Sequence, residues 1–77
     1  MYRFARVEVT KQFGKIVKEK VFVLYEGSLE GLLKKLKDKK YPSIYRYSFE
    51  IHYRFFLETE YGWETVSDPR YLKLLDS

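Results

Sequence analysis

Cysteine and asparagine are absent from this chain of 77 residues, which contains one glutamine, one methionine and two prolines. Without cysteine, neither a disulfide framework nor a thiolate metal site is available, so packing must stabilise the fold. This length predicts one domain, near the lower limit of what a single core stabilises. Few thermolabile residues and 34% charged residues are typical of hyperthermophile proteins, and predict a thermophilic archaeal, bacterial or viral source.

Long apolar runs are also absent, since no stretch approaches the roughly 18 apolar residues of a membrane span. The first residues alternate between apolar and charged side chains and do not form the apolar block of a signal peptide. These patterns predict a cytoplasmic protein with no membrane partner.

No motif for a cofactor, a metal ion or a nucleophile stands out, and the expectation is a protein that is not an enzyme, with no cofactor or metal. His52 is the single histidine. A catalytic histidine needs a second acid-base group or a nucleophile in a pocket, and a domain this small offers little pocket. A cross-strand hydrogen bond is therefore the role expected for His52.

Charge is distributed unevenly along the chain. Residues 1–40 carry eleven Lys or Arg against five acids, a net charge of +6, whereas residues 41–77 carry four against six, a net charge of −2. The densest cationic cluster is KKLKDKK, residues 34–40. A basic half favours a polyanionic partner. Lysines in the last turn of a helix also offset the helix dipole without any partner, so that alternative stays open.

Hydrophobic patterning predicts one α+β domain over residues 1–77. Residues 2–11 and 15–25 are rich in β-branched and aromatic side chains and indicate a hairpin that turns at Gly14. Four leucines at helical spacing after Ser28, a favourable N-cap, then predict an amphipathic helix over residues 29–40.

The two-residue period returns over residues 44–59 and predicts one long strand. A second hairpin with Tyr61 and Gly62 at its turn would place Leu57 opposite Val66, and Asp68 with Pro69 would open a short C-terminal helix. The order β-β-α-β-β-α predicts a two-layer fold with an antiparallel or mixed four-stranded sheet, one main amphipathic helix and a short C-terminal helix. A β-grasp-like arrangement is compatible with this order.

The long strand contains the aromatic stretch YRYSFEIHYRFF, residues 45–56. Its odd-numbered positions are all apolar or aromatic and predict a face covered by the main helix. Thirteen strand residues span about 40 Å, whereas a twelve-residue helix spans about 18 Å, so one helix cannot cover the stripe. The overhang at Tyr45 and Tyr47 is expected to bend, to stay exposed or to be buried by a second copy.

The opposite face of the sheet is expected to combine cations with aromatic rings. Its members would be Arg6, Lys18, Lys20, Arg46 and Arg54 together with Phe4, Phe22 and Phe56. Such mixtures occur on open sheets that bind single-stranded nucleic acids. In the alternative, the rings lie beneath the C-terminal helix and the cations form a solvated rim.

The leading hypothesis is a small basic accessory protein that binds nucleic acid, DNA or RNA, with little sequence specificity. The alternative is a protein–protein interaction module or homodimer formed through the aromatic strand and the sheet edges, without nucleic-acid binding. The residues predicted to contact phosphates are Arg6, Lys18, Lys20, Lys34, Lys35, Lys37, Lys40, Arg46 and Arg54. Those predicted to stack on bases or form an interface are Tyr45, Tyr47 and Phe56.

Overall fold

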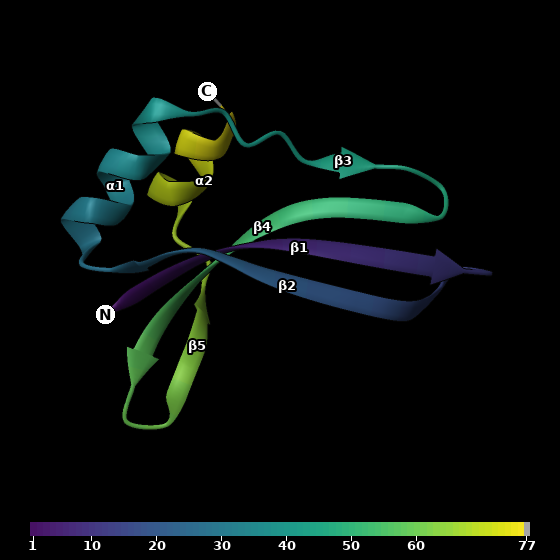
Figure 1. Ribbon diagram of the computed structural model, residues 1–77, viewed down its shortest axis with the longest axis horizontal. Coiled ribbons are helices and arrows are strands. Elements are labelled where there is room, and N and C mark those ends of the chain that lie inside the picture. Colours follow the sequence, from purple (N-terminus) through teal and green to yellow (C-terminus); the bar gives the residue numbers. More distant parts are fainter. Residues whose placement is uncertain (77) are drawn as a thin grey trace.

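The computed structural model describes residues 1–76, except for the side chains of Leu72, Leu74 and Asp76 (Figure 1). The elements are β1 (Tyr2–Gln12), β2 (Lys15–Gly27), α1 (Leu29–Asp38), β3 (Ile44–Tyr45), β4 (Phe49–Thr59), β5 (Gly62–Val66) and α2 (Pro69–Asp76). The α+β class is confirmed. The sheet has five strands instead of the predicted four, because the predicted strand 44–59 is divided into β3 and β4.

Every described strand pairing is antiparallel. The strand order is β2-β1-β4-β3, with β5 also paired to β4. β3 pairs with the beginning of β4 and β5 with its end, so the two short strands follow one another along the same edge of β4. Because the described strands include no parallel pair, the mixed sheet and the β-grasp-like arrangement, which has a parallel central pair, are not formed.

A tight turn at residues 46–49 interrupts the predicted long strand and separates β3 from β4. The backbone N–H of Arg46 donates to the carbonyl oxygen of Phe49 (2.8 Å), and the N–H of Phe49 donates to the carbonyl oxygen of Arg46 (3.3 Å). The turn folds β3 back along β4. Of the alternatives for the overhang, the chain therefore bends, and Tyr45 and Tyr47 remain exposed.

The second hairpin forms in a different register from the predicted one. Leu57 lies opposite Glu64, and Phe55 lies opposite Val66. The turn consists of residues 60–61, and Gly62, with a φ of 105°, already belongs to β5. This shift of two residues leaves every side chain on its expected face, because the side-chain period of a strand is also two.

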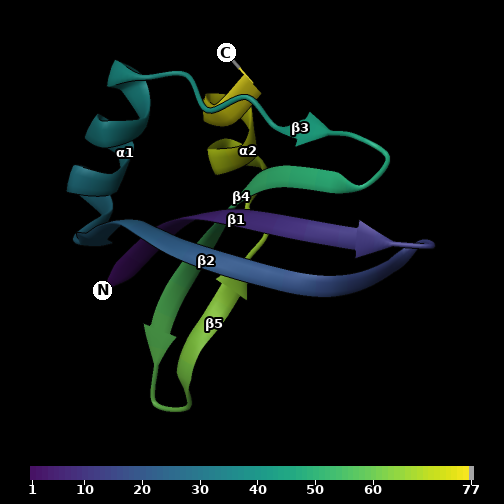
Figure 2. The same ribbon diagram turned by 45° about the vertical axis from the view of Figure 1, so that its right-hand side comes forward.

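Both helices lie over one end of the sheet on the same side, as Figures 1 and 2 show. The core beneath them consists of Phe4, Leu32, Leu36, Tyr41, Phe55 and Tyr71. The ring of Phe4 stacks on those of Phe55 (5.1 Å between centroids) and Tyr53 (5.6 Å). Aromatic pairs of this kind contribute about 0.5–1.5 kcal/mol beyond the area that they bury.

The position of Phe4 overturns one expectation. β1 pairs with β4 so that Phe4 lies opposite Phe55 and Arg6 opposite Tyr53. Directly opposed residues share a face, so Phe4 and Arg6 lie on the side of the helices, which we call the helix face. The prediction that they lie on the side away from the main helix is wrong, because it lacked the register between β1 and β4.

A β-bulge changes the alternation in β2. The register shifts between Phe4 and Ala5, where Leu24 is the extra residue, so that Phe4 pairs with Tyr25 and Ala5 with Val23. Tyr25 therefore lies on the helix face and Val23 on the other. Strict alternation would have placed both on one face.

We call the side of the sheet without helices the open face, and charged side chains such as Arg54 and Glu19 lie on it. Ala5, Val7 and Val9 of the central strand β1 are nonetheless at most 2% exposed. Arg54 of β4 pairs with Glu19 of β2 (3.4 Å), and since β1 lies between these strands, the pair crosses β1. Long aliphatic stems of this kind cover apolar surface while their charges stay in water.

Candidate nucleic-acid interface

The sheet extends beyond the helices at one end (Figure 1), which we call the distal end and define as residues 10–20 and 44–49. The backbone N–H of Lys11 donates to the carbonyl oxygen of Ser48 (2.9 Å), and Thr10 lies opposite Phe49. These contacts bring the β1–β2 turn and the β3–β4 turn together.

Three aromatic rings are exposed at the distal end. The exposed fractions of Phe13, Tyr45 and Tyr47 are 88%, 67% and 93%. Phe13 and Gly14 both have positive φ, 53° and 77°, as a two-residue hairpin turn requires. A phenylalanine adopts this conformation rarely, and its ring cannot reach the core from the turn.

Sequence reasoning located this turn but missed Phe13 as a candidate contact residue. The available signal was the aromatic residue directly before the turn glycine, a position from which a side chain points away from the sheet.

The cations of the distal end differ in whether they are paired. Lys11 pairs with Glu50. The cations with no carboxylate within salt-bridge distance, among the side chains described, are Lys15, Lys18, Lys20 and Arg46. The distal end therefore combines exposed rings with positive charge that no described acid neutralises.

The set of residues predicted to share one face is divided by the structure. Lys18 and Lys20 lie on the helix face, opposite Thr10 and Glu8. Arg54 lies on the open face, where it pairs with Glu19. Arg46 lies in the β3–β4 turn.

The predicted rings are divided in the same way. Phe4 is fully buried and is removed from the candidate surface. Phe22 lies opposite Arg6 on the helix face, whereas Phe56 lies opposite Arg3 on the open face. Arg3 itself stacks over the ring of Trp63 (3.9 Å).

The lysine cluster of residues 34–40 is not brought to the distal end. Lys34, Lys35 and Lys37 belong to α1, which stands over the other end of the sheet (Figure 1), and Lys40 follows it. Lys35 and Lys37 lie in the last turn of α1, where they favourably offset the helix dipole. The cluster forms a second cationic patch.

The other hairpin tip is acidic. Glu58, Glu60 and Glu64 are exposed at and beside the β4–β5 turn, which points away from the distal end (Figure 1). The β4–β5 hairpin is therefore an anionic tip on a molecule whose distal end is cationic, and a polyanion is repelled from this hairpin.

Two of the grooves that the described side chains form lie on the helix face. The larger, of about 360 Å³, is lined by Arg6, Glu8, Phe22 and Leu24. Within it, Arg6 Nη2 lies 3.4 Å from Glu8 Oε2. By their register these residues lie between the core and Lys18 and Lys20.

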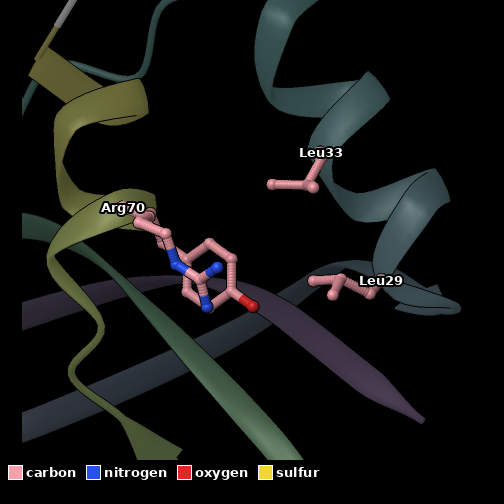
Figure 3. Close-up of a pocket in the computed structure, with 4 residues that line it drawn as sticks. Leu29, Leu33 and Arg70 are labelled. Carbon is pink, nitrogen blue, oxygen red and sulfur yellow. The ribbon is translucent and has the colours of Figure 1, made fainter.

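The smaller groove, of about 190 Å³, lies between α1 and α2 and is lined by Leu29, Leu33, Arg70 and Tyr71 (Figure 3). Arg70 Nη2 pairs with Asp68 Oδ2 (2.8 Å). Hydrogen bonds from the Arg70 side chain lower the pKa of the Asp68 carboxyl. Since Asp68 already holds this cation, the groove is an apolar space beside a neutralised charge.

His52 lies on the open face opposite Val7. Burial lowers its pKa, and the neighbouring Arg54 lowers it further. Among the described side chains, His52 makes no hydrogen bond, so the expected cross-strand bond is not found.

Among the side chains that the structure describes, no three from His, Cys, Asp or Glu gather in a way that would hold a metal ion. No helix within residues 1–76 has the length and apolar character needed to cross a membrane. Comparison with protein-family models, curated protein sequences and solved structures finds no match to this chain.

Proposed function

We propose that the protein binds single-stranded nucleic acid at its distal end, with little sequence specificity. The observation that carries this proposal is the grouping of exposed rings with unneutralised cations: Phe13, Tyr45, Tyr47, Lys15, Lys18, Lys20 and Arg46. Monomeric proteins rarely leave several large apolar side chains together in water unless the surface has a partner.

The two kinds of side chain have separate roles. Each ring stacks on an unpaired base, which contributes about 1–3 kcal/mol per base and tolerates any base identity. Each cation pairs with a phosphate and releases a counterion, so affinity falls steeply as salt rises. Bases inside a duplex offer no free face to these rings, and single strands are therefore preferred.

The lysine cluster on α1 serves as an auxiliary phosphate contact. Its members Lys34, Lys37, Lys39 and Lys40 are exposed. Because they lie away from the distal end, only a strand long enough to run from one patch to the other engages both.

An anisotropy titration with labelled oligonucleotides of about 15 nucleotides, the upper range of one small binding surface, tests the proposal. At about 50 mM salt, dT and U oligomers should bind and a duplex of equal length should bind less tightly. Phe13→Asn should weaken binding roughly 5- to 100-fold, the equivalent of one lost stacking contact. Its thermal midpoint should not fall, because the ring is exposed.

Tyr61→Asn is the matched control, since Tyr61 is equally exposed but lies in the acidic β4–β5 turn. It should leave affinity unchanged. Absence of binding by the wild-type protein at low salt overturns the proposal, and equal losses in the two variants would remove the distal end as the site.

A second candidate, a protein–protein interaction module, is supported by the free edge of β2. This strand is 13 residues long and pairs on one side only, with β1. Its Val21 and Val23 are half exposed. A partner strand could add to such an edge, whereas β4, the aromatic strand first assigned to this role, is flanked on both sides within the sheet.

Sedimentation across a wide range of protein concentrations checks the homodimer form of this candidate. Self-association through β2 should be weakened by Val21→Lys, because a charged side chain on an edge strand opposes pairing. A strict monomer at every concentration argues against the homodimer.

A further inference from the structure

The larger groove on the helix face lies beside the cations of the distal end. Lys20 stands directly opposite Glu8 on β2, and Lys18 lies one pair further along the same face. A nucleic-acid strand that follows these lysines away from the β1–β2 turn therefore reaches the groove next. At about 360 Å³, the groove is within the range of roughly 300–1,000 Å³ typical of sites for small ligands.

We propose that this groove holds one unstacked nucleobase of the bound strand and prefers guanine. The inference rests on the proposed function, and it adds a base preference to binding that is otherwise insensitive to sequence.

The apolar part of the groove suits the flat face of a base. Phe22 is 45% exposed, which is unusual for a phenylalanine in the middle of a strand, and Leu24 beside it is half-buried. Leu24 lies there because it is the extra residue of the β-bulge. Stacking on an aromatic ring is how proteins commonly hold an unpaired base.

The polar part of the groove suits the edge of guanine. Guanine presents two adjacent donors, N1–H and the N2 amino group, beside the acceptor O6, and no other common base has this order. A carboxylate accepts two hydrogen bonds side by side, and a guanidinium only donates. The carboxylate of Glu8 therefore matches the N1–H and N2 donors of guanine, and the guanidinium of Arg6 matches its O6. These two side chains are adjacent and partly exposed.

The charges around Glu8 also permit a strand to approach. A lone carboxylate would repel phosphates, but Arg6 pairs with it at 3.4 Å and Lys20 lies opposite. Two cations around one acid leave the groove with net positive charge. The Nη groups of Arg6 keep unused donors, since one contact to Glu8 occupies only part of the five that a guanidinium offers.

Anisotropy titrations with three oligonucleotides of about 15 nucleotides test the inference: all dT, dT with one central dG, and dT with one central deoxyinosine. Inosine keeps O6 and N1–H but lacks the N2 amino group. The dG oligomer should bind roughly 5- to 100-fold more tightly than all dT, the range expected of a bidentate base contact. The inosine oligomer should lose most of this gain.

Glu8→Gln should abolish the preference for dG, because an amide offers only one acceptor and replaces the other with a donor. Glu58→Gln makes the same charge change on the acidic hairpin and should preserve the preference. The readout is the ratio of affinities for dG and dT oligomers, which a general change in charge does not move.

These measurements distinguish a failure of the guanine preference from a failure of the proposed nucleic-acid binding. Equal affinities of the wild-type protein for all three oligomers would overturn the guanine preference and leave nucleic-acid binding intact. Binding to none of them would overturn the proposed function itself, and the groove inference with it.

Discussion

His52 is the single histidine of the chain, and histidine is the residue type whose ordinary pKa lies closest to neutral pH. Its pKa is lowered in the folded state by burial and by Arg54, so folding favours the neutral imidazole. As the pH falls through about 6.5, the ordinary value, the unfolded chain binds a proton before the folded one does. The free energy of unfolding should therefore have its full value above this pH. It should decrease below this pH until the folded form is also protonated.

Urea unfolding at several pH values between about 7 and 5.5 measures this effect. The chain has one histidine and no cysteine, and histidine is the side-chain type whose ordinary pKa lies in this interval. His52→Gln should therefore be nearly flat over this interval. A variant that loses stability as steeply as the wild-type protein would assign the pH dependence to other groups.

Phe13 shows how a single residue can be kept against its conformational preference. Non-glycine residues in the left-handed region cost on the order of 1 kcal/mol or more, and Asn would adopt the φ of 53° more easily. Residues held in strained conformations cluster at functional sites. The stability of Phe13→Asn, already proposed as a binding variant, should therefore equal or exceed that of the wild-type protein.

At the scale of elements, the contact between β2 and α1 depends on Gly31. A Cβ at this position would lie 2.1 Å from Tyr25 Oη, and this hydroxyl donates to the carbonyl oxygen of Ser28 (2.9 Å). Alanine is favoured over glycine in helices by about 1 kcal/mol. We nevertheless expect Gly31→Ala to lower the free energy of unfolding, because the tyrosine must leave its place.

A double-mutant cycle in denaturant separates these two effects. In a Tyr25→Ala background the obstruction is gone, and Gly31→Ala should stabilise the protein by about 1 kcal/mol. If Gly31→Ala gains that amount in the presence of Tyr25, the ring does not restrict the helix.

Several elements were predictable because local chemistry determines them. The N–H of Gly31 donates to Ser28 Oγ (3.3 Å) and the N–H of Arg70 donates to Asp68 Oδ1 (2.9 Å), so both predicted caps open a helix. The turn at residues 46–49 was not predictable from the two-residue strand period, since the alternation of apolar and polar residues continues through it. The bulge at Leu24 likewise has no marker in the sequence.

At the scale of the whole molecule, the residues that form the candidate site could be predicted only in part from the sequence. The uneven charge and the overhang of Tyr45 and Tyr47 were visible in the sequence, and both tyrosines are exposed. Which cations share a face depends on the register of β1 against β4. That register places Arg6 on the helix face and Arg54 on the open face, and neither local pattern nor charge indicates it.

The separation of charge also orients the molecule. Exposed cations lie at the distal end and on α1, and exposed acids lie on the β4–β5 hairpin. A polyanion attracts the first and repels the second. Under the proposed function, a copy bound to a nucleic-acid strand would therefore present its acidic hairpin away from that strand.

The central place of β1 has a consequence for how the chain folds. Phe4 must meet Phe55, 51 residues later in the sequence, before the aromatic core exists. Contacts between such distant segments slow folding, because much of the chain loses its freedom before they form. β1 and β2 are synthesised before β4, and until β4 pairs with β1 the inner strand of the sheet is an edge. During synthesis β1 is therefore open to wrong pairing, although in the finished protein β2 and β4 flank it on both sides.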